Sequence, residues 1–174
     1  LSRLLDGTVL VAGGDVSPTA AEIYDPRTRS FRTTGIMQAA RYSHKSVLLP
    51  SGRVLLVGNV YSGSASAEEF DPALGTFAPT IGPPLVARYG PAAQLLPNGK
   101  VLVVGGNDQS NKAELYDPVT GLFTFTGDTQ FRHGFSCSIL LLRDGSTIVA
   151  SDSGLERYDY RSGSFLPVGG SETA

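Results

Sequence analysis

An arginine followed by an aromatic residue occurs three times in this chain, at Arg41-Tyr42, Arg88-Tyr89 and Arg132-His133. A guanidinium group binds carboxylates and sulfates through paired hydrogen bonds, and an aromatic ring offers a flat face for stacking. Three such pairs brought together would bind a carboxylate, a sulfate, a sugar or an acidic peptide. The alternative is structural: each arginine satisfies loop carbonyl groups and each ring packs on its neighbour. Regular repetition at equivalent positions favours this structural interpretation.

Four glutamates also recur in one repeated phrase, at Glu22, Glu68, Glu114 and Glu156. Paired carboxylates can share a proton in acid–base catalysis, but these residues are expected to lie about one repeat apart, which is too far. We interpret them as structural or solvated. The sequence contains no nucleophile elbow, phosphate-binding loop or metal-ligand spacing, so it predicts no catalytic residue, no metal and no cofactor.

Composition argues against two classes of partner. The 174 residues have a formal net charge of −2, and the 14 basic and 16 acidic side chains are spread along the chain. Nucleic-acid binding needs a basic stripe, which is absent from the sequence. No apolar run approaches the roughly 20 residues of a membrane span. Cys137 is the single cysteine, which excludes an intrachain disulfide and leaves the compartment undecided.

The segments that must position these residues belong to a sequence repeat. The phrase AEIYDPRTRSF at 21–31 returns in related form at 67–77, 113–123 and 155–165. A second phrase, with a turn glycine, lies between the copies, and its glycines are 45, 47 and 46 residues apart: Gly7, Gly52, Gly99 and Gly145. Two independent marks with one period indicate a repeat architecture.

Each repeat reads as four antiparallel strands. The first, such as His44–Leu49 or Pro91–Leu96, ends at a Ser-Gly, Asn-Gly or Asp-Gly hairpin turn. The second is apolar throughout, which predicts cover on both faces, and it stops at glycines that permit close backbone approach. The third carries the repeated glutamate and ends in an Asp-Pro turn. The fourth centres on a phenylalanine able to fill space between units, at Phe31, Phe77, Phe123 or Phe165.

Four-stranded sheets repeated radially are the blades of a β-propeller. The double glycine, the Tyr-Asp-Pro turn and an aromatic residue about six positions later, at a period near 46, resemble kelch repeats of the galactose-oxidase-like type. The resemblance covers essentially the whole chain. It departs from the pattern at Gly58–Asn59, Ser151–Asp152 and Arg29, and it lacks tryptophan. The prediction is an all-β, kelch-type β-propeller segment of four four-stranded antiparallel blades, at about 1–34, 35–80, 81–126 and 127–170.

The resemblance also implies a redox alternative. Copper radical oxidases share this type of propeller and use two tyrosines, one of them cysteine-linked, and two histidines. Those residue types are supplied here by Tyr42, Tyr89, Cys137, His44 and His133. The adjacent Tyr-His pair of that family is not matched, because Ser43 intervenes, and Cys137 reads as a small buried apolar residue. A fragment of a carbohydrate or alcohol oxidase is therefore the alternative to a non-catalytic binding module.

Strand order assigns the loops to two faces. In a four-stranded meander the first–second and third–fourth turns share one side, and the remaining loops share the other. Here the remaining loops are long and differ between copies, as expected of binding loops on a rigid scaffold. The binding prediction therefore names Arg41, Tyr42, Arg88, Tyr89, Arg132, His133, Asn59, Asn107 and Asp108. The expected ligand is a protein or a glycan.

Four blades leave three possible assemblies. The chain is expected to be part of a larger propeller, half of a two-chain ring, or a closed four-bladed ring, and the first is favoured. Leu1–Leu5 reads as the tail of a first strand. End blades without neighbours would leave an apolar face in water, and burial is worth about 25 cal/mol per Å². A homodimer that completes an eight-bladed ring would provide that burial.

Overall fold

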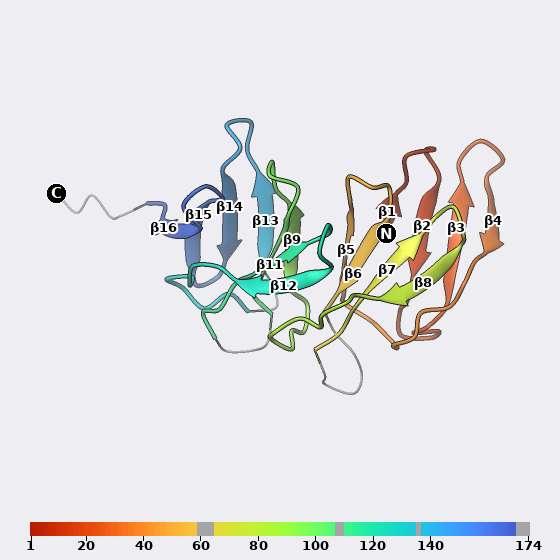
Figure 1. Cartoon of the computed structure of the whole chain (residues 1–174), viewed down its shortest axis with the longest axis horizontal. Helices are drawn as coiled ribbons and strands as arrows, with labels where there is room; N and C mark the ends of the chain where they lie inside the picture. Colours follow the sequence, from red (N-terminus) through yellow and green to blue (C-terminus); the bar gives the residue numbers. More distant parts are fainter. Residues whose placement is uncertain (59–64, 107–109, 135–136, 170–174) are drawn as a thin grey trace.

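The computed structural model describes residues 1–58, 65–106, 110–134 and 137–169. In these ranges the chain forms sixteen strands and no helix. The strands make four separate four-stranded antiparallel sheets, each pairing its strands in chain order. The predicted all-β class with four four-stranded blades is confirmed (Figure 1). The described part of the chain has no helix long and apolar enough to cross a membrane.

Each sheet occupies one stretch of sequence. The first blade comprises β1 (Ser2–Arg3), β2 (Val9–Ala12), β3 (Ala21–Asp25) and β4 (Ser30–Thr33). The second comprises β5 (Lys45–Leu48), β6 (Val54–Val57), β7 (Ala67–Asp71) and β8 (Thr76–Pro79). The third comprises β9 (Ala92–Leu95), β10 (Val101–Val104), β11 (Glu114–Asp117) and β12 (Leu122–Phe125). The fourth comprises β13 (Ser138–Leu141), β14 (Thr147–Ser151), β15 (Gly154–Asp159) and β16 (Ser164–Pro167).

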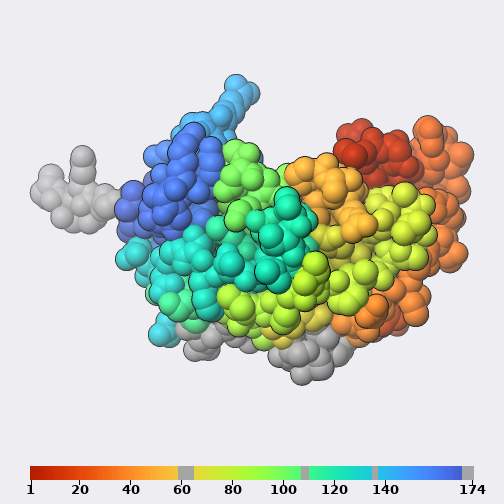
Figure 2. All heavy atoms as spheres, in the orientation of Figure 1, coloured from red at the N-terminus to blue at the C-terminus, as the bar shows by residue number. Residues whose placement is uncertain are grey.

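The blades are arranged as an open, propeller-like arc. The first strands of consecutive blades are neighbours, so β1 lies by β5, β5 by β9, and β9 by β13. The first blade (red and orange) and the fourth blade (blue) lie at opposite ends of the molecule, with the other two between them (Figures 1 and 2). The interpretation as a closed four-bladed ring is therefore wrong for this structure. We call the surface formed by the four first strands the inner face.

The hydrophobic core lies between blades. Each of three buried clusters joins two consecutive blades, as when Leu10 and Ile23 of the first pack with Val54 and Phe77 of the second. All residues of β6 and β10 are buried, so the prediction that the apolar second strands are covered on both faces holds for the two middle blades. In the end blades, β2 and β14 are only partly buried. The repeated phenylalanine fills the space between units in three blades. Consecutive blades thus depend on each other for burial.

The Asp-Pro turns form as the sequence predicts. Asp71 and Asp117 each accept a hydrogen bond from a backbone N–H two residues later, both at 2.9 Å. This bond from Val119 lowers the pKa of Asp117. The turns then require a positive φ, which is 66° at Gly75. In the first blade the same position is Arg29, with a φ of 56°, so an L-residue there carries backbone strain.

Arg29→Gly is expected to raise the free energy of unfolding by about 1 kcal/mol, because glycine adopts positive φ without a clash at Cβ. Denaturant unfolding followed by circular dichroism would measure the change. Arg29→Ala is the matched control, since it removes the charge and retains the strain. Equal stabilisation by both variants would show that the charge of Arg29, not its backbone, is the cause.

A second repeated contact joins each blade to the next. The backbone N–H of a glycine in the loop leaving one blade donates to the carbonyl of the turn glycine in the following blade. The pairs are Gly35 to Gly75 at 2.8 Å, Gly82 to Gly121 at 2.9 Å and Gly127 to Gly163 at 2.8 Å. A Cβ added at Gly127 would lie 2.3 Å from the Gly163 carbonyl oxygen. We call this contact the loop–turn hydrogen bond.

Candidate ligand-binding site

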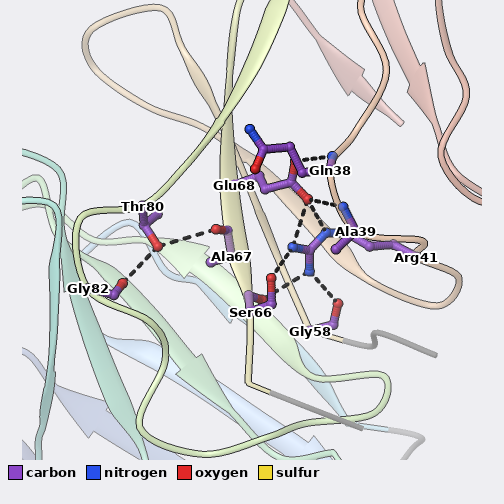
Figure 3. A network of polar contacts seen from close by, with 9 residues as sticks. All are labelled: Gln38, Ala39, Arg41, Gly58, Ser66, Ala67, Glu68, Thr80 and Gly82. Carbon is purple, nitrogen blue, oxygen red and sulfur yellow. Dashed lines mark hydrogen bonds and ion pairs between the residues drawn. The ribbon is translucent and has the colours of Figure 1, made fainter. Parts of the chain in front are cut away.

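Arg41 lies between the first and second blades and is fully buried (Figure 3). Its Nε and Nη2 donate to Glu68 Oε1 at 3.2 and 3.0 Å. Its Nη1 donates to the carbonyl oxygens of Gly58 and Ser66, and Nη2 also donates to Ser66 Oγ. Burial lowers the pKa of the Arg41 guanidinium, and the Glu68 carboxylate opposes this effect. All five N–H groups of the guanidinium are therefore used inside the protein.

Glu68 ties the loop leaving the first blade to the third strand of the second. Its carboxylate accepts hydrogen bonds from the backbone N–H of Gln38 at 2.7 Å and of Ala39 at 3.1 Å (Figure 3). With Arg41, this buried acceptor is matched to two amides and one guanidinium. A buried carboxylate is tolerated only with such compensation.

The same arrangement recurs at the next two blade boundaries. Arg88 Nε donates to Glu114 Oε2 at 2.9 Å, and Arg88 also donates to the carbonyl oxygens of Gly105 and Lys112. At the last boundary His133 Nε2 lies 3.4 Å from Glu156 Oε2, and backbone N–H groups of the preceding loop donate to Glu156. We call these three pairs the inter-blade polar pairs. The glutamates of these pairs are structural, which is one of the two interpretations (structural or solvated) that the sequence analysis gave for them.

The sequence register of the third pair needs a correction. The sequence pattern equates Arg132 with Arg41 and Arg88. In the structure it is His133 that contacts the carboxylate of Glu156, and Arg132 is exposed. An imidazole N–H donates to a carboxylate as a guanidinium N–H does, so histidine can fill the arginine position. The side chains of Arg41, Arg88 and His133 are buried within the protein. All three side chains lie against a buried glutamate at a blade boundary.

Tyr42 and Tyr89 are brought together, as the sequence analysis expected. Their ring centroids are 5.3 Å apart at an interplanar angle of 74°, and both rings are partly exposed. A hydrogen bond between the two side chains raises the pKa of Tyr89. Ser43, which follows Tyr42, has a φ of 51°, a conformation that costs an L-residue energy. The pair precedes β5 and β9 in the chain, so it lies where the loops enter the inner face.

A hollow of about 270 Å³ lies on the inner face. It is lined by residues of β5, β9 and β13 and by Cys137, which precedes β13. Its polar lining residues are Lys45, Gln94 and Ser138. The sequence analysis missed these three residues. The available signal was a polar residue in each first strand, where the opposite face of the strand is apolar.

Two other residues considered for redox chemistry, Cys137 and His44, have pKa values shifted mainly by burial. Burial raises the pKa of the Cys137 thiol to about 11, so it is protonated at neutral pH. Burial and, next, the charge of Arg41 lower the pKa of His44 to about 4, so its imidazole is neutral. No group of three His, Cys, Asp or Glu side chains among the described residues could hold a metal ion.

His44 should make stability depend on pH. The unfolded chain binds a proton at the ordinary pKa of 6.5, whereas the folded chain binds it only near 4. Stability is therefore complete above 6.5 and falls as the pH drops toward 4, by on the order of 2 kcal/mol at about pH 5. Urea unfolding at about pH 7 and pH 5 would measure this loss. His44→Gln should lose less stability over the same interval; an unchanged pH dependence would exclude His44 as its source.

Two larger hollows lie on the opposite face, among the tight turns. One of about 480 Å³ lies between the first two blades and includes Asp71 and Pro72; another of about 390 Å³ lies between the second and third and includes Asp117 and Pro118. Both are lined by the same pair of repeated turns, so they follow from blade spacing. They carry no feature that distinguishes one boundary from the next.

The remaining predicted binding residues, Asn59, Asn107 and Asp108, lie outside the described residues. Of the other six, the structure buries three, pairs the two tyrosines, and exposes Arg132. A scan against protein-family models and a search of curated proteins both found no match to this sequence.

Proposed function

We propose that this chain is a non-catalytic binding module that holds a glycan or protein ligand on its inner face and the loops beside it. The observation that carries the proposal is the Tyr42–Tyr89 pair beside strands whose hollow presents Lys45, Gln94 and Ser138. Ligand sites typically combine an apolar or aromatic surface with a few convergent polar groups. An aromatic ring, an amide and a hydroxyl suit the faces and hydroxyl groups of a sugar.

The charge of the site narrows the proposed ligand. Lys45 is exposed, and its ammonium at the hollow favours a carboxylate or sulfate on the ligand. Arg132 is also exposed in the loop that precedes the fourth blade. We therefore favour an acidic glycan over a neutral one, and an acidic peptide over a basic one.

The kelch-type assignment is part of this proposal. It is supported by the four blades and by the close approach at the glycines that end the second strands. A Cβ built at Gly105 would lie 3.0 Å from the His133 carbonyl oxygen, and one at Gly13 would lie 2.4 Å from that of Arg41. The oxidase alternative has less support, because burial keeps the Cys137 thiol protonated and His133 is engaged with Glu156 and Ser151.

Binding to an oligogalacturonate, measured by titration calorimetry after a survey of neutral and acidic glycans, would test the proposal. Tyr89→Ala and Lys45→Ala are each expected to weaken binding at least about tenfold, the loss of one good contact. Thr120→Ala, in an exposed turn of the opposite face, is the control and should leave affinity unchanged. If binding were lost in the Thr120 variant and retained in the other two, the site would lie on the opposite face and the assignment to the inner face would be wrong. If the chain bound no acidic glycan and no acidic peptide, the proposal would be overturned.

A further inference from the structure

The outer surface of the first blade repeats a buried blade surface but is exposed. In the second blade Val54, Phe70 and Phe77 lie in one row across β6, β7 and β8 and pack against the first blade. The equivalent row of the first blade is Val9, Tyr24 and Phe31. Phe77 is 8% exposed, whereas Phe31 is 58% exposed. We call the surface around Phe31 the leading face.

The outer surface of the fourth blade is likewise exposed, whereas the equivalent surface of an inner blade is covered by the blade that follows. Leu140, Ile148 and Leu166 lie in one row across its sheet, together with Arg157. Leu140 stands five residues before its turn glycine, as Val47 does in the second blade. Val47 is 9% exposed because it packs against the third blade, whereas Leu140 is 62% exposed. We call the surface around Leu140 the trailing face.

Both end faces also have the backbone groups of a loop–turn hydrogen bond. Gly169 follows Phe165 by four residues, as Gly127 follows Phe123. On the leading face, the carbonyl of Arg29 occupies the position of the accepting carbonyl of Gly163. The leading face therefore has the acceptor, and the trailing face has a glycine N–H at the donor position.

We propose that the leading face of one copy of this chain binds the trailing face of a second copy. The proposed contact would repeat the three internal boundaries. At each of these, apolar residues of one blade pack on those of the next, and a glycine N–H donates to a turn carbonyl. Because the two faces lie at opposite ends of the arc, two copies joined at both ends form a ring of eight blades (Figure 2). Large exposed apolar patches of this kind mark interaction sites.

Sedimentation equilibrium of the chain at micromolar concentrations tests the proposal, and a dimer is the expected result. Phe31→Glu and Leu140→Glu should each give monomers, because a carboxylate then replaces the apolar centre of one face in both contacts. Both side chains are largely exposed, so the variants should fold, which circular dichroism would check. An equimolar mixture of the two variants should recover dimers, because one contact in each mixed pair keeps two unaltered faces.

The matched control is Val119→Glu, which changes an even more exposed apolar residue in a turn away from both end faces and should remain dimeric. A monomeric parent chain would overturn the proposal. Loss of dimers in only one of the Phe31 and Leu140 variants would also overturn it, because that result requires contact between two identical faces.

Discussion

Replacing Glu68 with alanine is expected to lower the free energy of unfolding by about 3–5 kcal/mol. The Arg41 guanidinium would remain buried without its counter-charge, and the backbone N–H groups of Gln38 and Ala39 would lose their acceptor. Each unsatisfied buried donor adds to the cost. Urea unfolding monitored by circular dichroism would measure the loss.

Glu22→Ala is the matched control for this prediction. Glu22 occupies the same position in the repeated phrase, but it belongs to the first blade and is exposed. Its replacement should change stability by no more than about 0.5 kcal/mol. Equal losses in the Glu22 and Glu68 variants would mean that the glutamate acts within its own strand and not across a blade boundary.

Phe123→Ala should cost about 3–5 kcal/mol, the range found for removing a large aromatic side chain from a core. Phe123 is 6% exposed and belongs to the cluster that joins the second and third blades. Its ring also packs on Tyr116, with the centroids 4.8 Å apart. Truncation to alanine would leave a cavity at this boundary, and thermal or urea unfolding would report the loss.

Phe31→Ala tests whether this cost arises from the neighbouring blade. Phe31 packs on Tyr24 with nearly the same geometry, at 4.9 Å, but no preceding blade covers it. Its replacement should cost less than about 1 kcal/mol. The comparison should be made in the Leu140→Glu background, where self-association does not bury Phe31. Similar losses for Phe31 and Phe123 would show that packing within the blade, not between blades, dominates.

The architecture could be predicted because its determinants are local and repeated. Turn dipeptides, the Asp-Pro turns and the continuously apolar second strands each specify a short segment, and the common period assembles the segments into four blades. The structure confirms four such sheets. The open arc could not be predicted in this way, because the angle between blades depends on side-chain packing across boundaries, which no local pattern encodes.

The candidate site was only partly predictable, for a related reason. In Arg41-Tyr42 two adjacent side chains point to different environments, and the sequence does not say which is buried. That choice is made by Glu68, which is 27 residues away in the chain and across a blade boundary. The signal was present as a glutamate at one strand position, preceded in the loop by arginine or histidine. In the last repeat this signal is hard to recognise, because His133 takes the place of the arginine while the adjacent Arg132 matches the arginines by residue type.

The coupling between Arg41 and Glu68 can be measured by a double-mutant cycle with Arg41→Met and Glu68→Gln. Each single change leaves one buried partner without the other, whereas the double change removes both charges and retains much of the volume. We predict that the double variant loses less free energy of unfolding than the two single variants lose together. The difference should be at least about 2 kcal/mol, as expected of residues in one buried network. Losses that add within about 0.5 kcal/mol would contradict the assignment of this pair as the link between blades, and would return Arg41 to the residues available for ligand binding.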